Sequence, residues 1–87
     1  MRHARPGALD RIEPLLAQIR AFPKLQERSR GVFYLKSKAF LHFHEDPAGL
    51  FADVRTTEGS DFERIKLGAP AGEAALLARV SALAGEV

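Results

Sequence analysis

The sequence predicts an α+β fold in which a helix, a four-stranded antiparallel meander sheet and a second helix follow one another. Three observations support this prediction. Apolar residues recur at helical spacing near the N-terminus, and β-branched and aromatic runs separated by turn residues fill the middle of the 87-residue chain. An alanine-rich stretch with an apolar stripe occupies its end. Two helices packed on such a sheet form an economical two-layer domain.

The first predicted helix ends before Pro23. Its start is open, because Asp10 and Glu13 resemble a capping box while Pro14 also fits a first-turn position. The apolar positions that define its buried side are Leu9, Ile12, Leu15, Leu16 and Ile19. The following stretch, residues 24–30, is mostly polar and is expected to be a connector.

Four strands are expected next, and their bounds are 31–36, 39–44, 50–55 and 61–67. Ser37 and Lys38 would form a two-residue turn between the first two strands. The stretch 45–49 concentrates Asp, Pro and Gly, so it is expected to be a five-residue hairpin loop. The second helix would begin at residues 68–70.

Composition limits the class of protein. The chain is 46% apolar and 28% charged, as in one compact domain, and we expect a flexible N-terminal tail over 1–7 and a single α+β domain over 8–87. The absence of cysteine excludes a disulfide framework, a cysteine-ligated metal and a thiol nucleophile, and it suits the cytoplasm. Apolar runs are far shorter than a membrane-spanning helix of ~20 residues, so no membrane partner is expected.

Charge is unevenly distributed along the chain. Residues 1–38 hold nine basic and three acidic residues, a net charge of +6, whereas residues 39–87 hold four basic and eight acidic residues, a net charge of −4. Either the basic half binds a polyanion, or the two halves complement each other within the fold or across a dimer. The total of only +2 favours the second interpretation and disfavours a nucleic-acid partner.

The expected turns assign the strand residues to two faces, and both faces carry large apolar side chains. One face would hold Phe33, Leu35, Phe40, His42, His44, Leu50, Ala52 and Val54; the other would hold Val32, Tyr34, Leu41, Phe43, Phe51, Asp53 and Arg55. The helices can cover only one face. We therefore expect the second face to form a homodimer interface or a groove for a small-molecule or protein ligand.

One segment has the residue types of a site, namely His42-Phe43-His44-Glu45-Asp46. Residues two apart in a strand point the same way, so the two imidazoles would project from one face and could bind a metal. Asp53, Glu45 or Asp46 could add a third ligand. An ordinary pair of partly exposed strand histidines explains the same pattern and stays open.

Other classes have less support. No serine lies in a hydrolase elbow, no glycine-rich phosphate loop occurs, and no cofactor is expected. The basic and aromatic mixture near Phe33 and Tyr34 could hold a single nucleic-acid strand, although the same rings are more simply core residues. The basic side chains of that alternative are Arg28, Arg30, Lys36 and Lys38.

The stretch Gly31–Arg55, with the sequence GVFYLKSKAFLHFHED followed by GLFADVR, resembles the small bacterial "luciferase domain" proteins of unknown function. That resemblance covers about a third of the chain and implies a site at His42, His44, Asp53 and Arg55, without implying light emission. The chain is also loosely similar to the MmcQ/YjbR proteins, small α+β domains suspected of DNA binding, with no motif that matches residue by residue.

The sequence thus favours a small cytoplasmic binding or protein-interaction module that forms a homodimer, with no reaction indicated. A small enzyme or metal-binding protein that uses His42 and His44 is the alternative, and nucleic-acid binding through the basic half is a further one.

Overall fold

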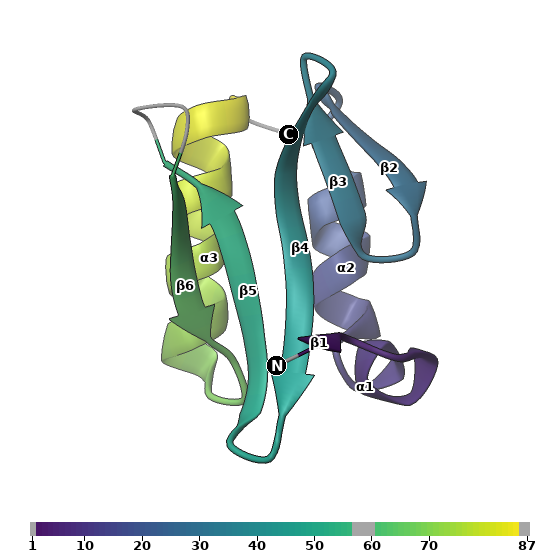
Figure 1. Cartoon of the computed structure of the whole chain (residues 1–87). Helices are drawn as coiled ribbons and strands as arrows, with labels where there is room; N and C mark the ends of the chain where they lie inside the picture. The colour runs from purple at the N-terminus through teal and green to yellow at the C-terminus, as the bar shows by residue number, and fades with distance from the viewer. Residues whose placement is uncertain (1, 57–60, 86–87) are drawn as a thin grey trace.

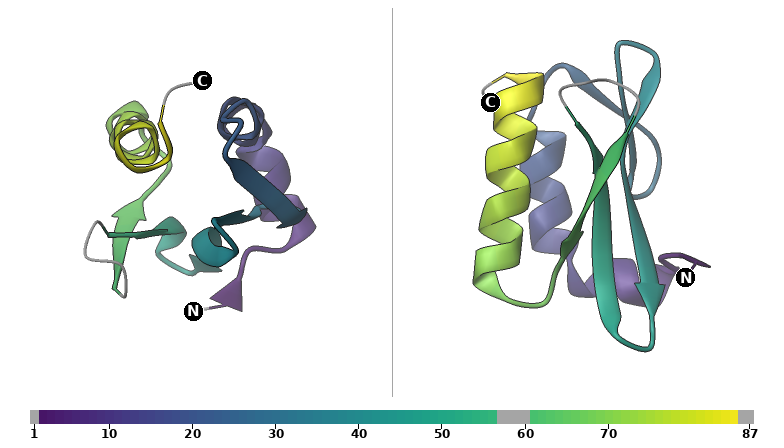
Figure 2. Two further views of the ribbon diagram at one scale, coloured as in Figure 1. Left: turned by 90° about the horizontal axis from the view of Figure 1, so that it is seen from above. Right: turned by 60° about the vertical axis from the view of Figure 1, so that its left-hand side comes forward.

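The computed structural model describes residues 2–56 and 61–85 of the chain. It has two layers, an antiparallel sheet and a layer of helices on one of its faces (Figure 1). Figure 2 shows α2 and α3 side by side on the same side of the sheet, which leaves the other face of the sheet free of helices. The predicted α+β class and the antiparallel sheet are confirmed.

The sheet contains more strands than the sequence predicted. Its main path follows the order β2-β3-β4-β5-β6, and the two-residue strand β1 pairs with β4 beside that path. The bounds are β1 Arg2–His3, β2 Leu25–Ser29, β3 Val32–Leu35, β4 Lys38–Asp46, β5 Gly49–Arg55 and β6 Phe62–Lys66. The four predicted strands correspond to β3 through β6.

The first predicted helix is two helices, α1 Pro6–Arg11 and α2 Glu13–Arg20, separated at Ile12. Pro14 lies in the first turn of α2, where a missing N–H costs least. The third helix, α3 Pro70–Ala84, begins where the sequence predicted it, with Pro70 in its first turn.

Two segments expected to lack regular structure form strands. The expected connector contains β2, which sequence reasoning missed because Glu27 points inward among otherwise polar residues; its carboxylate accepts hydrogen bonds from Arg20 of α2 at 2.6 and 3.1 Å. The expected flexible tail contains β1 and the start of α1. Residues 2–3 and 6–7 therefore belong to a strand and a helix, and residue 1 lies outside the described residues.

The first hairpin turn lies one residue earlier than predicted. Leu35 pairs with Lys38, and the turn residues Lys36 and Ser37 have φ angles of 53° and 68°, as the tight turn of a twisted hairpin requires. Further along, Tyr34 pairs with Ala39 but Phe33 pairs with Leu41. Phe40 is thus the extra residue of a β-bulge, and the bulge reverses the faces of all later residues of β4.

The second hairpin is also tighter than predicted. Asp46 pairs with Gly49, so the turn is the two residues Pro47 and Ala48 and not a five-residue loop. The Asp46 carboxylate stabilises the turn by accepting a hydrogen bond from the Ala48 N–H at 2.8 Å. This shifts the register by one residue relative to the prediction, because Leu50 pairs with Glu45 and not with His44.

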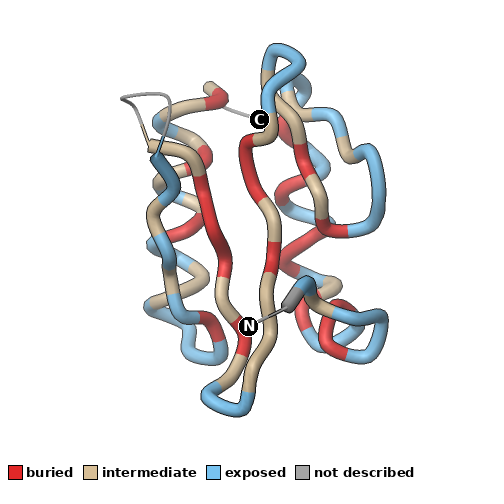
Figure 3. Tube along the Cα trace, in the orientation of Figure 1, coloured by how far each residue is buried: buried red, intermediate tan, exposed pale blue. Residues whose placement is uncertain are grey.

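These two differences correct the predicted sheet faces. The apolar residues Phe33, Leu35, Leu41, Phe43, Leu50, Ala52 and Val54 share the helix-covered face, whereas His42 and His44 lie opposite, with Val32, Tyr34, Phe51, Asp53 and Arg55. Buried positions of the central strands and of the helices meet in one core (Figure 3). The second apolar face from which we expected a homodimer is therefore replaced by a mixed polar and aromatic face, which we call the open face.

Ion pairs mostly join residues of the same half of the chain. Arg20 and Arg30 contact the three acidic residues of the N-terminal half, Asp10, Glu13 and Glu27. Among the described residues, Arg5 and Glu45 make a pair that does link the two halves, at 3.3 Å. Among the described residues of one chain, these ion pairs therefore show little complementarity between the two halves, and complementarity across a dimer stays a prediction. No helix among the described residues is long and apolar enough to cross a membrane.

Candidate metal centre

Strand β4 places two histidines on the open face. His42 and His44 are two residues apart beyond the Phe40 bulge, so both imidazoles project from the side that no helix covers. Both side chains are partly buried. The bulge matters, because without it these rings would point into the core and Phe43 would point to solvent.

A third histidine comes from β1. The short strand β3 leaves the far end of β4 unpaired on one side, and β1 occupies this edge, with His3 opposite His44. The Ala4 N–H continues the pairing by donating to the Phe43 carbonyl at 3.0 Å. The predicted site did not include His3, because its neighbours gave no signal of a strand.

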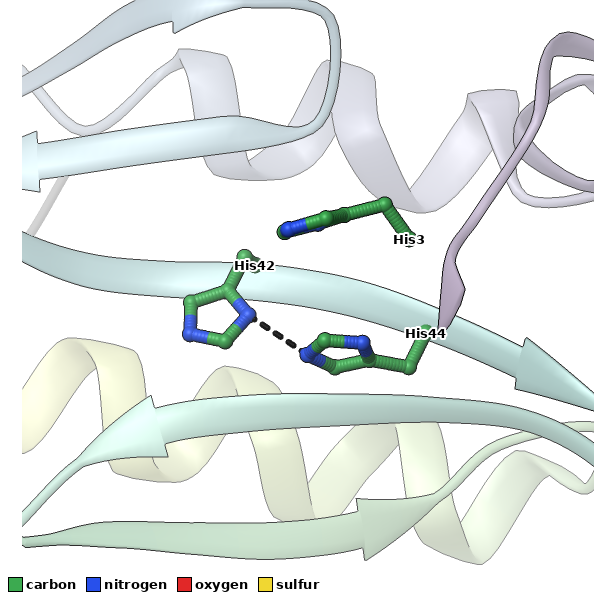
Figure 4. A group of neighbouring side chains, drawn as sticks. All are labelled: His3, His42 and His44. Atoms are coloured by element: carbon green, nitrogen blue, oxygen red, sulfur yellow. Dashed lines mark hydrogen bonds between the residues drawn. The ribbon is translucent and has the colours of Figure 1, made fainter. Parts of the chain in front are cut away.

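The three imidazoles gather closely on the open face (Figure 4). His42 Nδ1 and His44 Nε2 lie 2.8 Å apart and share a hydrogen bond. The His3 ring stacks on the His44 ring with centroids 5.0 Å apart, and it lies 5.8 Å from the His42 ring. One ligating nitrogen from each residue can be chosen so that all three lie within 4.8 Å of one another.

Asp53 supplies a carboxylate beside this cluster. Its residue is only 6% exposed, and its Oδ2 lies 3.2 Å from His44 Nε2. Arg64 of β6 holds the carboxylate in a bidentate pair at 2.8 and 2.9 Å. This hydrogen-bonded guanidinium keeps the pKa of Asp53 below its usual value despite burial, so the carboxylate is charged at neutral pH.

The environment of His42 favours the neutral ring. Burial lowers the pKa of His42 most, and the neighbouring His44 lowers it further, while the charge of Asp53 opposes both effects. Phe62 contributes to the apolar surroundings, with its ring centroid 5.2 Å from that of His42. Neutral imidazole is the form that binds metal ions, so His42 is prepared for ligation near neutral pH.

Two nitrogens of His44 have different surroundings. Nε2 lies 2.8 Å from His42 Nδ1 and 3.2 Å from Asp53 Oδ2, so it faces both the neighbouring ring and the carboxylate. Nδ1 is buried and has no hydrogen-bond partner within the described parts of the chain. Of the two nitrogens, Nε2 is therefore the one directed toward the other candidate ligands.

The remaining predicted site residues have other contacts. Arg55 lies on the open face beyond Asp53, donates from Nε to the Ala39 carbonyl at 2.7 Å and places Cζ 4.7 Å from the centroid of the Phe62 ring. Glu45 accepts hydrogen bonds from the Arg5 N–H and side chain, at 2.8 and 3.3 Å. Asp46 stabilises the hairpin turn. Asp53 is thus the acidic candidate that lies beside the histidines.

The predicted nucleic-acid residues do not form one group. Arg28 lies over the Tyr34 ring, with Cζ 4.2 Å from the centroid, whereas Arg30 pairs with Asp10 and Glu13 of the helix layer at 2.8 Å. The other two, Lys36 and Lys38, lie in or beside the first hairpin turn. Of the four basic residues expected near Phe33 and Tyr34, Arg28 is thus the one that lies over an aromatic ring of this pair.

Two residues of β6 that the sequence analysis did not single out contribute to the centre. Arg64 pairs with Asp53 in the β5–β6 register, and Phe62 contacts His42. In the segment Phe62-Glu63-Arg64, the first and third side chains lie on one face of the sheet. The sequence does not give the register of the β5–β6 hairpin, and this register is what places Arg64 opposite Asp53.

The spacing of the three histidines can be compared with that of a tetrahedral metal site. With metal–nitrogen bonds of about 2.0–2.1 Å, two ligands of a tetrahedral zinc ion lie ~3.3 Å apart. The separation of 2.8 Å between His42 Nδ1 and His44 Nε2 is close to this value. The ligating atoms of all three histidines lie within 4.8 Å of one another, a wider spacing, so metal binding would draw the rings closer together.

In comparisons with protein-family models, curated proteins and solved structures, nothing matches the chain.

Proposed function

We propose that this protein is a small binding module that holds a divalent transition-metal ion, zinc first among them, on the open face of its sheet. The observation that carries the proposal is the convergence of His3, His42 and His44, whose ligating atoms lie within 4.8 Å of one another although His3 belongs to a separate strand. This goes beyond the sequence-based expectation, which named only two histidines and no cofactor.

The donor set supports zinc or a neighbouring metal. Imidazole nitrogens suit zinc, copper and nickel, whereas magnesium and calcium prefer sites made of oxygen ligands. The lowered pKa of His42 keeps one ring in its ligating form. The charge of Asp53 next to His44 favours a cation at the centre of the cluster.

The number of protein ligands decides whether a metal site is structural or has a position open to another ligand. Both oxygens of Asp53 already accept hydrogen bonds from Arg64. We therefore infer that the three imidazoles are the direct ligands and that the fourth position is exchangeable. Sites of this kind bind a small molecule or activate a water molecule, whereas fully occupied sites are structural. A small enzyme is accordingly the alternative to a binding module.

Titration calorimetry with zinc tests the proposal. We expect one zinc ion per chain, and we expect His3→Ala and His42→Ala each to weaken binding by at least about 100-fold. All three histidines of the chain belong to the cluster, so the matched control is Gln26→Ala, an exposed polar side chain of β2. Absence of binding by the unaltered chain, or equal affinity of the His3→Ala variant, overturns the three-histidine site.

For the location of the protein and its oligomeric state, we keep the two proposals made from the sequence. We infer a cytoplasmic protein, supported by the absence of cysteine, and a homodimer, supported by the small size of the domain. Sedimentation at several protein concentrations tests the dimer, and the resemblance to small bacterial proteins of unknown function adds no reaction to this proposal.

A further inference from the structure

The open face carries aromatic rings on two separate strands, one half-buried and one exposed. Tyr34 lies on β3 and Phe62 on β6, and both belong to this face by the strand register. Phe62 is 37% exposed and is the one large hydrophobic side chain classed as exposed within residues 2–56 and 61–85. An exposed ring on the edge strand of a sheet face, away from the core, is available for contact with a partner.

A guanidinium group already lies over each of these rings. Arg28 places Cζ 4.2 Å from the Tyr34 centroid, and Arg55 places Cζ 4.7 Å from the Phe62 centroid. A planar cation over a ring holds both groups in an orientation that a third planar group can join by stacking. The face therefore presents two preformed pairs of a flat ring and a positive charge.

The charge of the open face is positive. Lys66 of β6 adds to Arg28 and Arg55 on this side. Arg64 balances the charge of Asp53, so these three basic residues outnumber the one remaining described acid of this face, Asp46. The acids of the N-terminal half contact Arg20 and Arg30 instead, so none of their ion pairs reaches Arg28.

The spacing of the rings fits a short strand of nucleotides. From β3 to β6 there are three interstrand steps, or roughly 14 Å, which two or three extended nucleotides span. A cavity of about 470 Å³ adjoins Tyr34 and is also lined by His3, Val32 and Phe43, so space for a planar group exists beside that ring.

We propose that the open face binds single-stranded nucleic acid, with bases stacked on Tyr34 and Phe62 and phosphates contacted by Arg28, Arg55 and Lys66. Base stacking on aromatic rings combined with a positive surface is how proteins hold single strands without reading sequence. This inference reverses the expectation from net charge, because the negative charge of the chain lies largely off this face. It is independent of the metal site.

Fluorescence anisotropy tests the inference with labelled oligouridylate and oligothymidylate of about 12 nucleotides, at ~50 mM salt with EDTA present. The chelator removes metal, so failure of the metal proposal does not affect the result. We expect Phe62→Ala to weaken binding about tenfold. Arg28→Gln should reduce the slope of log affinity against log salt by about 0.7, the value for one phosphate contact on a single strand. Tighter binding of the RNA than the DNA probe would indicate contacts to the 2′-hydroxyl and would also support the proposal.

The controls separate stacking from general attraction to polyanions. Lys24→Gln removes one charge beside the end of α3, away from the open face, and should leave the affinity unchanged. Phe62→Leu keeps an apolar side chain if the alanine variant does not fold, and it should also weaken binding because it lacks a ring. The proposal is overturned by absence of binding, by equal affinity for duplex DNA, or by unchanged affinity of a folded Phe62 variant.

Discussion

Asp53 Oδ2 lies 3.2 Å from His44 Nε2, although the residue paired with His44 across β4 and β5 is Phe51 and the one paired with Asp53 is His42. The carboxylate therefore reaches diagonally along the open face. Arg64 on the next strand holds it in that position through two hydrogen bonds. This places a buried negative charge between two imidazoles and a guanidinium.

Asp53→Asn should weaken zinc binding by about 10- to 100-fold, the usual effect of changing a group that supports metal ligands. The substitution keeps the shape of the side chain but removes the charge that attracts the cation to His44. Titration calorimetry against Asp61→Asn, an exposed acid that precedes β6, isolates the effect of position. Equal affinities of the two variants would show that Asp53 does not act on the metal.

The fold class and most element positions could be predicted, because they depend on local periodicity. The spacing of Leu15, Leu16 and Ile19 and the alternation within residues 50–55 are properties of single segments. The faces of β4 could not be predicted. They depend on a bulge at Phe40, where Phe40 and Leu41 are both buried in succession, and the sequence contains no residue that marks such an insertion.

The sequence named site residues only within one predicted hairpin, namely His42 and His44 with Asp53 and Arg55 on the following strand. His42 and His44 are conspicuous because a strand puts them on one side. His3 joins them only because β3 is too short to pair with the end of β4, a property of the whole sheet. The partner of Asp53 was missed for the same kind of reason, since Arg64 meets it through the β5–β6 register.

Metal binding should stabilise the pairing of β1 with β4. His3 belongs to β1 and the other two ligands to β4, so the ion would cross-link the two strands. The Ala4 N–H, which donates to the Phe43 carbonyl, reports on this pairing. We expect its hydrogen exchange to slow at least about tenfold on addition of zinc, and to be unaffected by zinc in the His3→Ala variant. Unchanged exchange in a chain that binds zinc would mean that His3 is not a ligand.

Glu27→Gln should destabilise the protein at pH 7 by about 1 kcal/mol, because Glu27 joins β2 to α2. Burial acts to raise the pKa of Glu27, but the Arg20 guanidinium and the Gly31 N–H outweigh it, and the pKa is lower than in an unfolded chain. A lowered pKa contributes stability above the unfolded value of 4.5 that is lost as the pH falls through the folded pKa. Urea unfolding of both proteins should therefore show a difference at pH 7 that narrows below about pH 4. A difference that is constant with pH would exclude an electrostatic origin.

Gly72→Ala should destabilise the protein by about 1–3 kcal/mol, because the first turn of α3 lies directly against the end of β6. A Cβ at this position would lie 2.2 Å from the Lys66 carbonyl oxygen, a backbone atom that cannot move without shifting β6.

Gly7→Ala is the matched control, since Gly7 also lies in a helix and its Cβ would meet nothing within 4 Å. Alanine should be neutral or stabilising there, by up to ~1 kcal/mol, because it restricts the unfolded chain. Thermal unfolding of both variants measures the two effects, and equal stabilities would show that α3 does not pack this closely on β6. Because Phe62 and Arg64 occupy that strand, the Gly72→Ala variant should also weaken zinc binding, whereas the Gly7→Ala variant should not.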